Sequence, residues 1–139
     1  MKKRIKLETT SEFPKNFIGI SSHFKDIQVV WSFNNLLGLK FTKTEDFLKK
    51  IKKSETTFHF SSFLYTDNQN FKHYLIANKN NETILFPKYK TIDFIYISDI
   101  SDKQLKTVIQ TISVSDKIIG NFLLPTENLI KIFKSLFEE

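Results

Sequence analysis

The chain has no cysteine and only three glycines, at positions 19, 38 and 120. Without cysteine there is no disulfide, no thiolate nucleophile and no thiolate ligand for zinc. A phosphate-binding loop needs several glycines within a few residues, and these three are far apart. No serine lies in a Gly-x-Ser-x-Gly motif. These absences argue against glycine-rich nucleotide-binding folds and against the common nucleophilic hydrolases.

The sequence also lacks any apolar run approaching the roughly 20 residues of a membrane-spanning helix. The first residues are basic, but polar residues 8–12 follow where a secretion signal has its apolar stretch. We therefore expect a soluble protein, compatible with a reducing cytosol. With 139 residues, 40% of them apolar and 15 of them Phe, the chain is long enough for an aromatic core. We expect one domain over residues 1–139, with residues 1–12 as a flexible basic N-terminal segment.

Arginine is nearly absent, since Arg4 is the only one among 21 basic residues. The formal net charge is +6, and residues 1–56 carry the whole excess, with 12 Lys and Arg against 6 Asp and Glu. Such asymmetry can mark an anionic partner. Proteins that clamp phosphates favour the planar guanidinium group, however, and a chain rich in Lys, Asn, Ile and Phe is typical of an AT-rich genome. We interpret most of this charge as a solvated surface.

Patterns of apolar residues and turn residues predict strands and helices in alternation. The expected strands are residues 16–21, 39–42, 57–66, 71–78, 83–86, 91–98 and 117–124, and the expected helices are 24–37, 44–53, one beginning after Ser101 and one beginning at Thr126. The order is β-α-β, a meander of strands, then α-β-α. This order is typical of an α+β domain, and we expect an antiparallel or mixed sheet with about three helices packed on one face.

Capping residues mark the expected helix ends. The pair Ser21-Ser22 offers an N-cap oxygen to the first helix, and Gly38 can end that helix in the left-handed conformation. Ser101 and Gln104 have the spacing of a capping box, the strongest helix start in the chain. Thr126 is expected to cap the last helix.

Residues 86–94 are the most informative segment, because they join a turn at Pro87 to a predicted strand that carries Asp93 between Ile92 and Phe94. Asp is rare inside strands, since a short charged group cannot cover a half-buried surface. Asp93 therefore needs a partner or a role. It is either a general base or anchor for a cationic partner, or it pairs with a lysine or with backbone donors of the Pro87 turn. We favour the second interpretation.

This segment resembles the signature of the IPExxxVDY family, a group of small uncharacterised bacterial proteins. The named positions of the signature are occupied here by Phe86, Pro87, Lys88, Ile92, Asp93 and Phe94. The Pro and the Asp are identical, but Lys88 reverses the charge of the family's Glu, so no role of that Glu is carried over. The similarity in element order extends from about residue 16 to the C-terminus. The resemblance implies a cytoplasmic bacterial protein and brings no activity, cofactor or partner with it.

Aromatic residues on the predicted strands suggest two kinds of interaction surface. A sheet face left uncovered would expose an apolar patch that suits a protein partner or a second copy. The candidate residues are Phe63, Tyr65, Tyr74 and Trp31. Alternatively, Phe63, Tyr65, Tyr74 and Tyr96 would stack the bases of single-stranded RNA on an exposed sheet face, with phosphates bound by Lys49, Lys50, Lys52 and Lys53. Alternatively, the second layer of the domain covers these rings.

The histidines give little support for a metal site. In one register of the predicted hairpin His59 and His73 approach each other and Asp93, a set that suits a metal. The chain has neither His-x-His nor His-Glu-x-x-His, however. We therefore expect ordinary strand histidines, no metal and no cofactor.

Taken together, these patterns predict a binding or assembly module rather than an enzyme. We expect it to act through protein contacts, as a homodimer or with an unidentified protein partner, and not on a membrane. Single-stranded RNA binding is the alternative from another class. A small enzyme that uses Asp93 with a histidine is a third hypothesis.

Overall fold

The computed structural model describes residues 16–50 and 56–134, and all structural statements below refer to these residues. The expected basic segment 1–12 lies outside them. None of the described helices has the length and apolarity needed to cross a bilayer.

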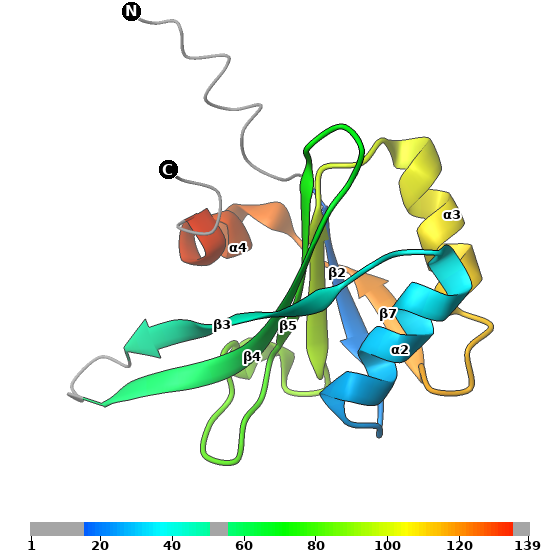
Figure 1. Ribbon diagram of the computed structural model, residues 1–139. Helices are drawn as coiled ribbons and strands as arrows, with labels where there is room; N and C mark the ends of the chain where they lie inside the picture. The colour runs from blue at the N-terminus through cyan, green and yellow to red at the C-terminus, as the bar shows by residue number, and fades with distance from the viewer. Residues whose placement is uncertain (1–15, 51–55, 135–139) are drawn as a thin grey trace, which may run out of the picture.

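One antiparallel sheet of six strands organises the molecule, in the order β3-β4-β5-β6-β2-β7 (Figure 1). The strands are β2 (Asn16–Ser21), β3 (Thr42–Lys50), β4 (Thr57–Thr66), β5 (Lys72–Ala77), β6 (Phe94–Ser98) and β7 (Gly120–Leu123). The predicted hairpin is present, with Ser62 opposite Ile76 in β4 and β5. β6 lies between β5 and β2, and β3 and β7 form the two edges of the sheet.

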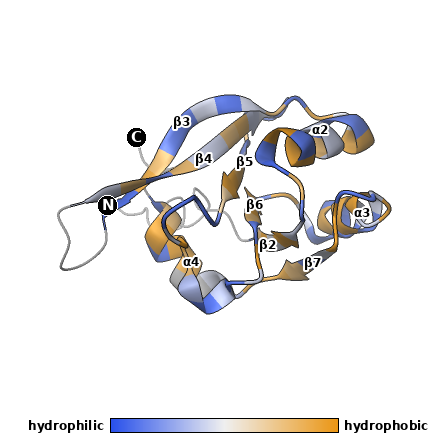
Figure 2. Ribbon diagram, turned by 90° about the horizontal axis from the view of Figure 1, so that it is seen from below, coloured by the Kyte–Doolittle hydropathy of each residue, from blue (hydrophilic) through white to orange (hydrophobic). Residues whose placement is uncertain are grey.

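Three α-helices cover the sheet, which confirms the expected α+β class with an antiparallel sheet. They are α2 (Asp26–Leu37), α3 (Asp102–Ile112) and α4 (Thr126–Phe133), and a short 3-10 helix, η1 (Pro87–Tyr89), precedes β6. We expected all helices on one face of the sheet, but α2 and α3 lie on one side and α4 lies on the other (Figure 2). The reason is that the central strands are apolar on both faces, so each face needs a cover.

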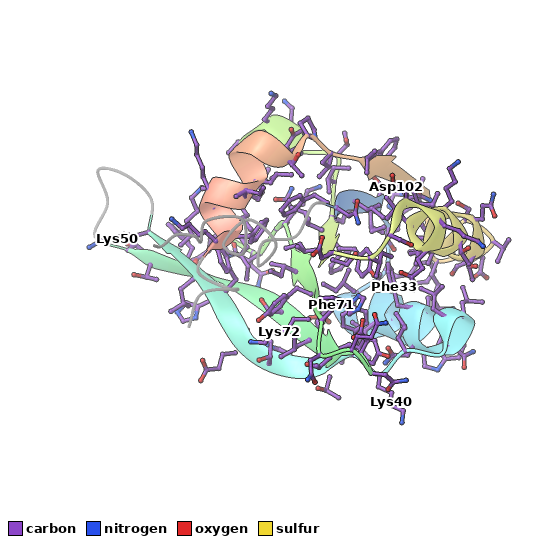
Figure 3. All side chains as sticks on the ribbon, turned by 90° about the horizontal axis from the view of Figure 1, so that it is seen from above. Phe33, Lys40, Lys50, Phe71, Lys72 and Asp102 are labelled. Carbon is purple, nitrogen blue, oxygen red and sulfur yellow. The ribbon has the colours of Figure 1, made fainter. Side chains whose placement is uncertain are left out.

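Two apolar clusters separated by the sheet form the core. Phe33, labelled in Figure 3, is almost completely buried in the cluster under α2 and α3. Tyr96 is almost completely buried in the same cluster, and the two ring centroids are 5.6 Å apart. Under α4, Phe17 and Phe133 stack with centroids 6.1 Å apart. Neighbouring residues of β6 alternate between the clusters, since Tyr96 belongs to the first and Ile95 to the second. Burial of large aromatic side chains therefore stabilises both faces.

The helix ends agree only in part with the predicted caps. In α3 the Ser101 Oγ accepts from the Gln104 backbone N–H at 3.2 Å, and the Gln104 Oε1 accepts from the Ser101 N–H, which confirms the capping box. Gly38 ends α2 with φ of 68°. The first cap was wrong, because α2 begins at Asp26 and Ser22 instead bonds Lys117. Thr126 is the first residue of α4 and not its cap, because Pro125 holds the N-cap position.

The prediction of a helix over residues 44–53 is also wrong for residues 44–50, which are the part of that range that the structure describes. Thr42–Lys50 is strand β3, paired with β4 and interrupted by a bulge between Thr44 and Phe47. Local propensity was ambiguous here, and pairing with β4 decided the conformation. The strand expected over residues 83–86 is reduced to a single bridge between Lys79 and Ile84.

Candidate functional site

Asp93 lies directly before β6 rather than inside it. Its backbone N–H donates to the Ile20 carbonyl at 2.8 Å, and its carbonyl accepts from the Asn78 N–H at 2.9 Å. The residue therefore joins the ends of the strands β2, β5 and β6. A charged group is tolerated here because the chain is leaving the apolar part of the sheet.

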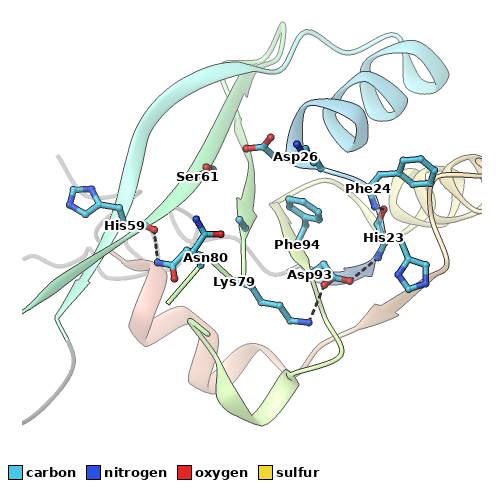
Figure 4. Close-up of a pocket in the computed structure, with 13 residues that line it drawn as sticks. His23, Phe24, Asp26, His59, Ser61, Lys79, Asn80, Asp93 and Phe94 are labelled. Atoms are coloured by element: carbon cyan, nitrogen blue, oxygen red, sulfur yellow. Dashed lines mark hydrogen bonds and ion pairs between the residues drawn. The ribbon is translucent and has the colours of Figure 1, made fainter. Parts of the chain in front are cut away.

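The carboxylate of Asp93 is held by two donors. Its Oδ2 accepts from the Ser22 backbone N–H at 2.8 Å, and its Oδ1 lies 3.1 Å from the Nζ of Lys79 (Figure 4). The Asp93 side chain is 26% exposed. The pairing with a lysine matches the interpretation we favoured, while the backbone donor comes from Ser22 and not from the Pro87 turn. This geometry is that of a clamp between strand ends.

A polar cleft of about 550 Å³ lies beside this clamp. Lys79, Asn80, Phe94 and residues 22–26, which end at the first residue of α2, line part of it. The His59 ring points away from Asp93 (Figure 4), and its Nδ1 lies 3.7 Å from the Asp46 Oδ2. His23 lines the same cleft, and neither histidine bonds the Asp93 carboxylate, whose partners are Ser22 and Lys79. The geometry therefore gives no support to an enzyme built on Asp93 with a histidine.

The structure separates the two strand histidines. His73 lies opposite Tyr65 in the β4–β5 register, six residues along β4 from His59. The His73 ring bonds Asp67 and the hydroxyl of Tyr96 instead. Within residues 16–50 and 56–134, no group of three or more His, Asp or Glu side chains is arranged to hold a metal ion.

The signature segment 86–94 wraps around a side chain that the sequence reasoning missed. Asn78 is completely buried, and its Nδ2 donates to the carbonyls of Tyr89 and Ile92 at 3.0 and 2.9 Å. Its Oδ1 accepts from the Phe86 N–H at 2.9 Å. An Asn directly after an apolar strand was the available signal. Three bonds from one buried amide fix the loop that delivers Asp93 to its position.

Two further residues of the signature, Ile92 and Lys88, differ in their burial. Ile92 is 2% exposed and packs so closely on Gly19 that a Cβ there would lie 2.7 Å from the Ile92 Cδ1. Lys88 is exposed, with its Nζ 5.8 Å from the centre of the Tyr89 ring. The segment is therefore a packed connection between sheet strands, and Lys88 stands at its surface.

The expected aromatic sheet face is not exposed. Phe63 and Tyr74 are each 6% exposed and belong to the clusters on opposite faces of the sheet. Tyr65 is half-buried against the first cluster. The prediction of an open aromatic face was wrong because helices cover both sides. Trp31 alone among the four candidates is exposed, at 56%, and the Lys117 Nζ lies 5.3 Å from its ring.

Two of the four lysines proposed for phosphates, Lys49 and Lys50, lie on the edge strand β3. Lys49 points back to the body of the protein, because its Nζ donates to the Leu85 carbonyl at 3.3 Å and lies 5.5 Å from the Phe86 ring centre. Lys50 is exposed at the end of β3 far from α2 and α3 (Figure 3). Lys52 and Lys53 lie outside the described residues.

The two edges of the sheet differ in a way that the sequence reasoning did not consider. β3 carries five charged residues, Lys43, Glu45, Asp46, Lys49 and Lys50, as well as the bulge. β7 carries none, although Phe122 and Leu123 are 51% and 64% exposed. Ile119, next to the strand, is 60% exposed. β7 is the candidate functional site because its outer edge, with which no described strand pairs, carries no charged side chain and exposes apolar ones.

No protein-family model, curated protein or solved structure matches this chain.

Proposed function

We propose that this protein is a non-enzymatic assembly module that pairs with a second copy of itself along β7. The observation that carries the proposal is the uncharged edge with its exposed apolar residues. The resemblance of residues 86–94 to the IPExxxVDY signature supports assigning the module to those cytoplasmic bacterial proteins.

An open sheet edge presents unpaired N–H and C=O groups, and monomeric proteins protect such edges with charges, bulges or a covering segment. β3 has charges and a bulge. In β7 the four residues are Gly, Asn, Phe and Leu, and no described strand pairs with its outer side. The difference supports a role for β7 in strand pairing.

The side chains of β7 supply apolar area on both faces of the sheet. Successive strand residues point to opposite faces, so Phe122 and Leu123 extend the two core clusters outward. A ladder of only four residues binds weakly by itself, and burial of these two side chains with Ile119 adds about 25 cal/mol for each Å² removed from water. Pairing would therefore bury exposed side chains together with the open backbone edge.

A second copy is the occupant that suits this edge best. Two copies each carry a net charge of +6 and repel one another, and this repulsion is smallest where the contact holds no charge. β7 is such a place. Antiparallel pairing of the same strand from two copies also closes on itself about a two-fold axis, so assembly stops at the dimer.

The alternatives have weaker support. Single-stranded RNA binding needs stacking rings on an open surface, and Phe63 and Tyr74 are buried. An enzyme using Asp93 with a histidine needs an imidazole at that carboxylate, and the carboxylate bonds the Ser22 N–H and the Lys79 ammonium instead.

Sedimentation equilibrium of the full chain tests the proposal. We expect the wild type to approach twice the monomer mass of 16.4 kDa as its concentration rises. The Leu123→Lys variant places a charge in the contact and should sediment as a monomer. Leu48→Lys is the matched control, because Leu48 is 54% exposed on the opposite edge strand β3. It should behave as the wild type does.

Two results would contradict the proposal. One is a wild type that stays at 16.4 kDa at its highest soluble concentration. The other is a dimer that dissociates with Leu48→Lys and survives Leu123→Lys. A monomer that binds single-stranded RNA with a steep salt dependence would favour the RNA alternative.

A further inference from the structure

A second cleft, far along the sheet from β7, lies between α3 and the β4–β5 hairpin. Its volume is about 530 Å³. Apolar walls come from Leu37 at the end of α2, from Leu39 after it, and from Ile100 before α3 and Val108 within it. Small-molecule sites of roughly 300–1,000 Å³ typically have such walls with a few convergent polar groups.

The polar wall of this cleft is a chain of three side chains. The Asp67 Oδ2 lies 2.9 Å from the His73 Nε2, and the His73 Nδ1 lies 3.0 Å from the Tyr96 hydroxyl. His73 is 4% exposed and Tyr96 is 1% exposed. A carboxylate only accepts hydrogen bonds, so the His73 Nε2 donates to Asp67. When Nδ1 carries no proton, it accepts from the Tyr96 hydroxyl.

The protonation states of the two ends follow from their surroundings. Burial raises the pKa of Asp67, but hydrogen bonds from His73, Phe71 and Gln69 outweigh it and hold the pKa below its usual value. Burial raises the pKa of Tyr96 to about 12. At neutral pH these three hydrogen-bonded side chains therefore have a charged acceptor at Asp67 and a protonated phenol at Tyr96.

Asp67 retains capacity for one more donor. Its Oδ1 accepts from the backbone N–H groups of Gln69 and Phe71 at 2.9 and 3.0 Å, whereas its Oδ2 accepts from His73 alone. A carboxylate has about four acceptor sites. The Asp67 side chain is 20% exposed and lines the cleft, so a ligand can reach the open site.

An aromatic surface lies beside this acceptor. The half-buried ring of Tyr65 also lines the cleft, with its centroid 5.2 Å from that of His73. Leu37 and Leu39 pack against the same core cluster as Tyr65. A flat ring placed here would contact Tyr65 and the two leucines.

We propose that this cleft binds a small uncharged aromatic alcohol, with its ring against Tyr65 and its hydroxyl donating to the Asp67 Oδ2. Asp67 disfavours an anion at this position. Lys103, which lines the same cleft, disfavours a cation. A neutral hydroxyl satisfies the open acceptor without either repulsion. The site is independent of the β7 contact.

A titration of the full chain, followed by amide NMR shifts, tests this site with three probes of one ring size. Phenol has the donor, anisole has the same ring and oxygen without the proton, and benzoate carries a negative charge. We expect saturable phenol shifts around Tyr65, Gln104 and Thr107. Anisole should bind about tenfold more weakly, which is the effect of one hydrogen bond to a charged acceptor, and benzoate more weakly still.

Three variants locate the binding. Thr107→Trp fills the cleft and should abolish the phenol shifts, while Gln110→Trp, an exposed position on α3 outside the cleft, should leave them unchanged. Asp67→Asn should reduce the affinity for phenol about tenfold and leave that for anisole unchanged. Equal affinities for phenol and anisole, phenol shifts that survive Thr107→Trp, or no saturable shift at any soluble concentration would overturn the proposal.

Discussion

The two edge strands show opposite ways of ending a β-sheet. β3 is nine residues long, with charged side chains and a bulge, whereas β7 is four residues long and uncharged. Both carry exposed large apolar side chains, Leu48 at 54% on β3 and Leu123 at 64% on β7. Exposure of apolar side chains therefore does not distinguish the edges. The distribution of charge does, and it indicates which edge is free to pair.

The contacts that hold the two edge strands in place differ as well. β7 pairs with β2, whose end is held by Asp93 through Ser22, and the Ser22 hydroxyl bonds the Lys117 carbonyl in the segment before β7. β3 pairs only with β4 and carries its own surface ion pair between Lys43 and Asp46. The signature segment thus supports the edge that we propose to be functional.

The largest effect is expected from removing the protection of β3. Replacing Lys43, Glu45 and Lys50 by Thr should open a second pairing edge, so that dimers join into larger species detectable by light scattering. Adding Leu123→Lys to this variant closes the β7 edge and should stop the growth. A triple variant that stays dimeric would show that these charges do not protect β3.

A smaller effect is expected from breaking the clamp behind β7. Asp93→Ala leaves the Ser22 N–H and the Lys79 ammonium without their acceptor, and should lower the free energy of unfolding by about 1–3 kcal/mol in urea titrations. Lys79→Ala removes only the half-exposed ion pair and should cost less than about 1 kcal/mol. If Asp93→Ala unfolds at the same urea concentration as the wild type, the carboxylate does not stabilise the fold and a functional role for it regains support.

The smallest effect concerns Asp67, which lies on the β3 side of the sheet. Its pKa is lowered in the folded state, so its stabilising contribution is present above the unfolded value of 3.8 and is lost as the pH falls through the folded pKa. Asp67→Asn should therefore flatten the acid limb of the stability curve. The mass measured by sedimentation at neutral pH should not change. A dimer lost with Asp67→Asn would mean that the β4–β5 hairpin takes part in the contact.

Much of the fold could be predicted because local signals and tertiary packing agree. The Asn16–Ser21 strand, the hairpin, the Ser101 capping box and the Gly38 helix end all follow from short-range patterns. Residues 44–50 were misassigned because Phe47 and Leu48 fit a helical turn as well as a strand, and only pairing with β4 selects the strand. Helices on one face were expected because no local pattern shows that a strand is covered on both sides.

The sites were harder to predict than the fold. Asp93 was identified from its apolar neighbours, and its lysine partner was anticipated, but the Ser22 donor comes from 71 residues away. The prediction of an exposed aromatic surface was wrong because the exposure of Phe63 and Tyr74 depends on which elements cover the sheet. Neither the bare β7 edge nor the Asp67–His73–Tyr96 chain has a sequence motif, since each exists only once the strand order is known.

Cross-linking between copies tests the central claim most directly, because the chain has no cysteine of its own. Single-cysteine variants Asn121→Cys on β7 and Leu48→Cys on β3, treated with a short bis-maleimide reagent at equal protein concentration, report which edge lies near its counterpart. The account predicts rapid covalent dimers from Asn121→Cys and few from Leu48→Cys. Faster cross-linking of Leu48→Cys, or equally slow reaction of both, would contradict pairing along β7.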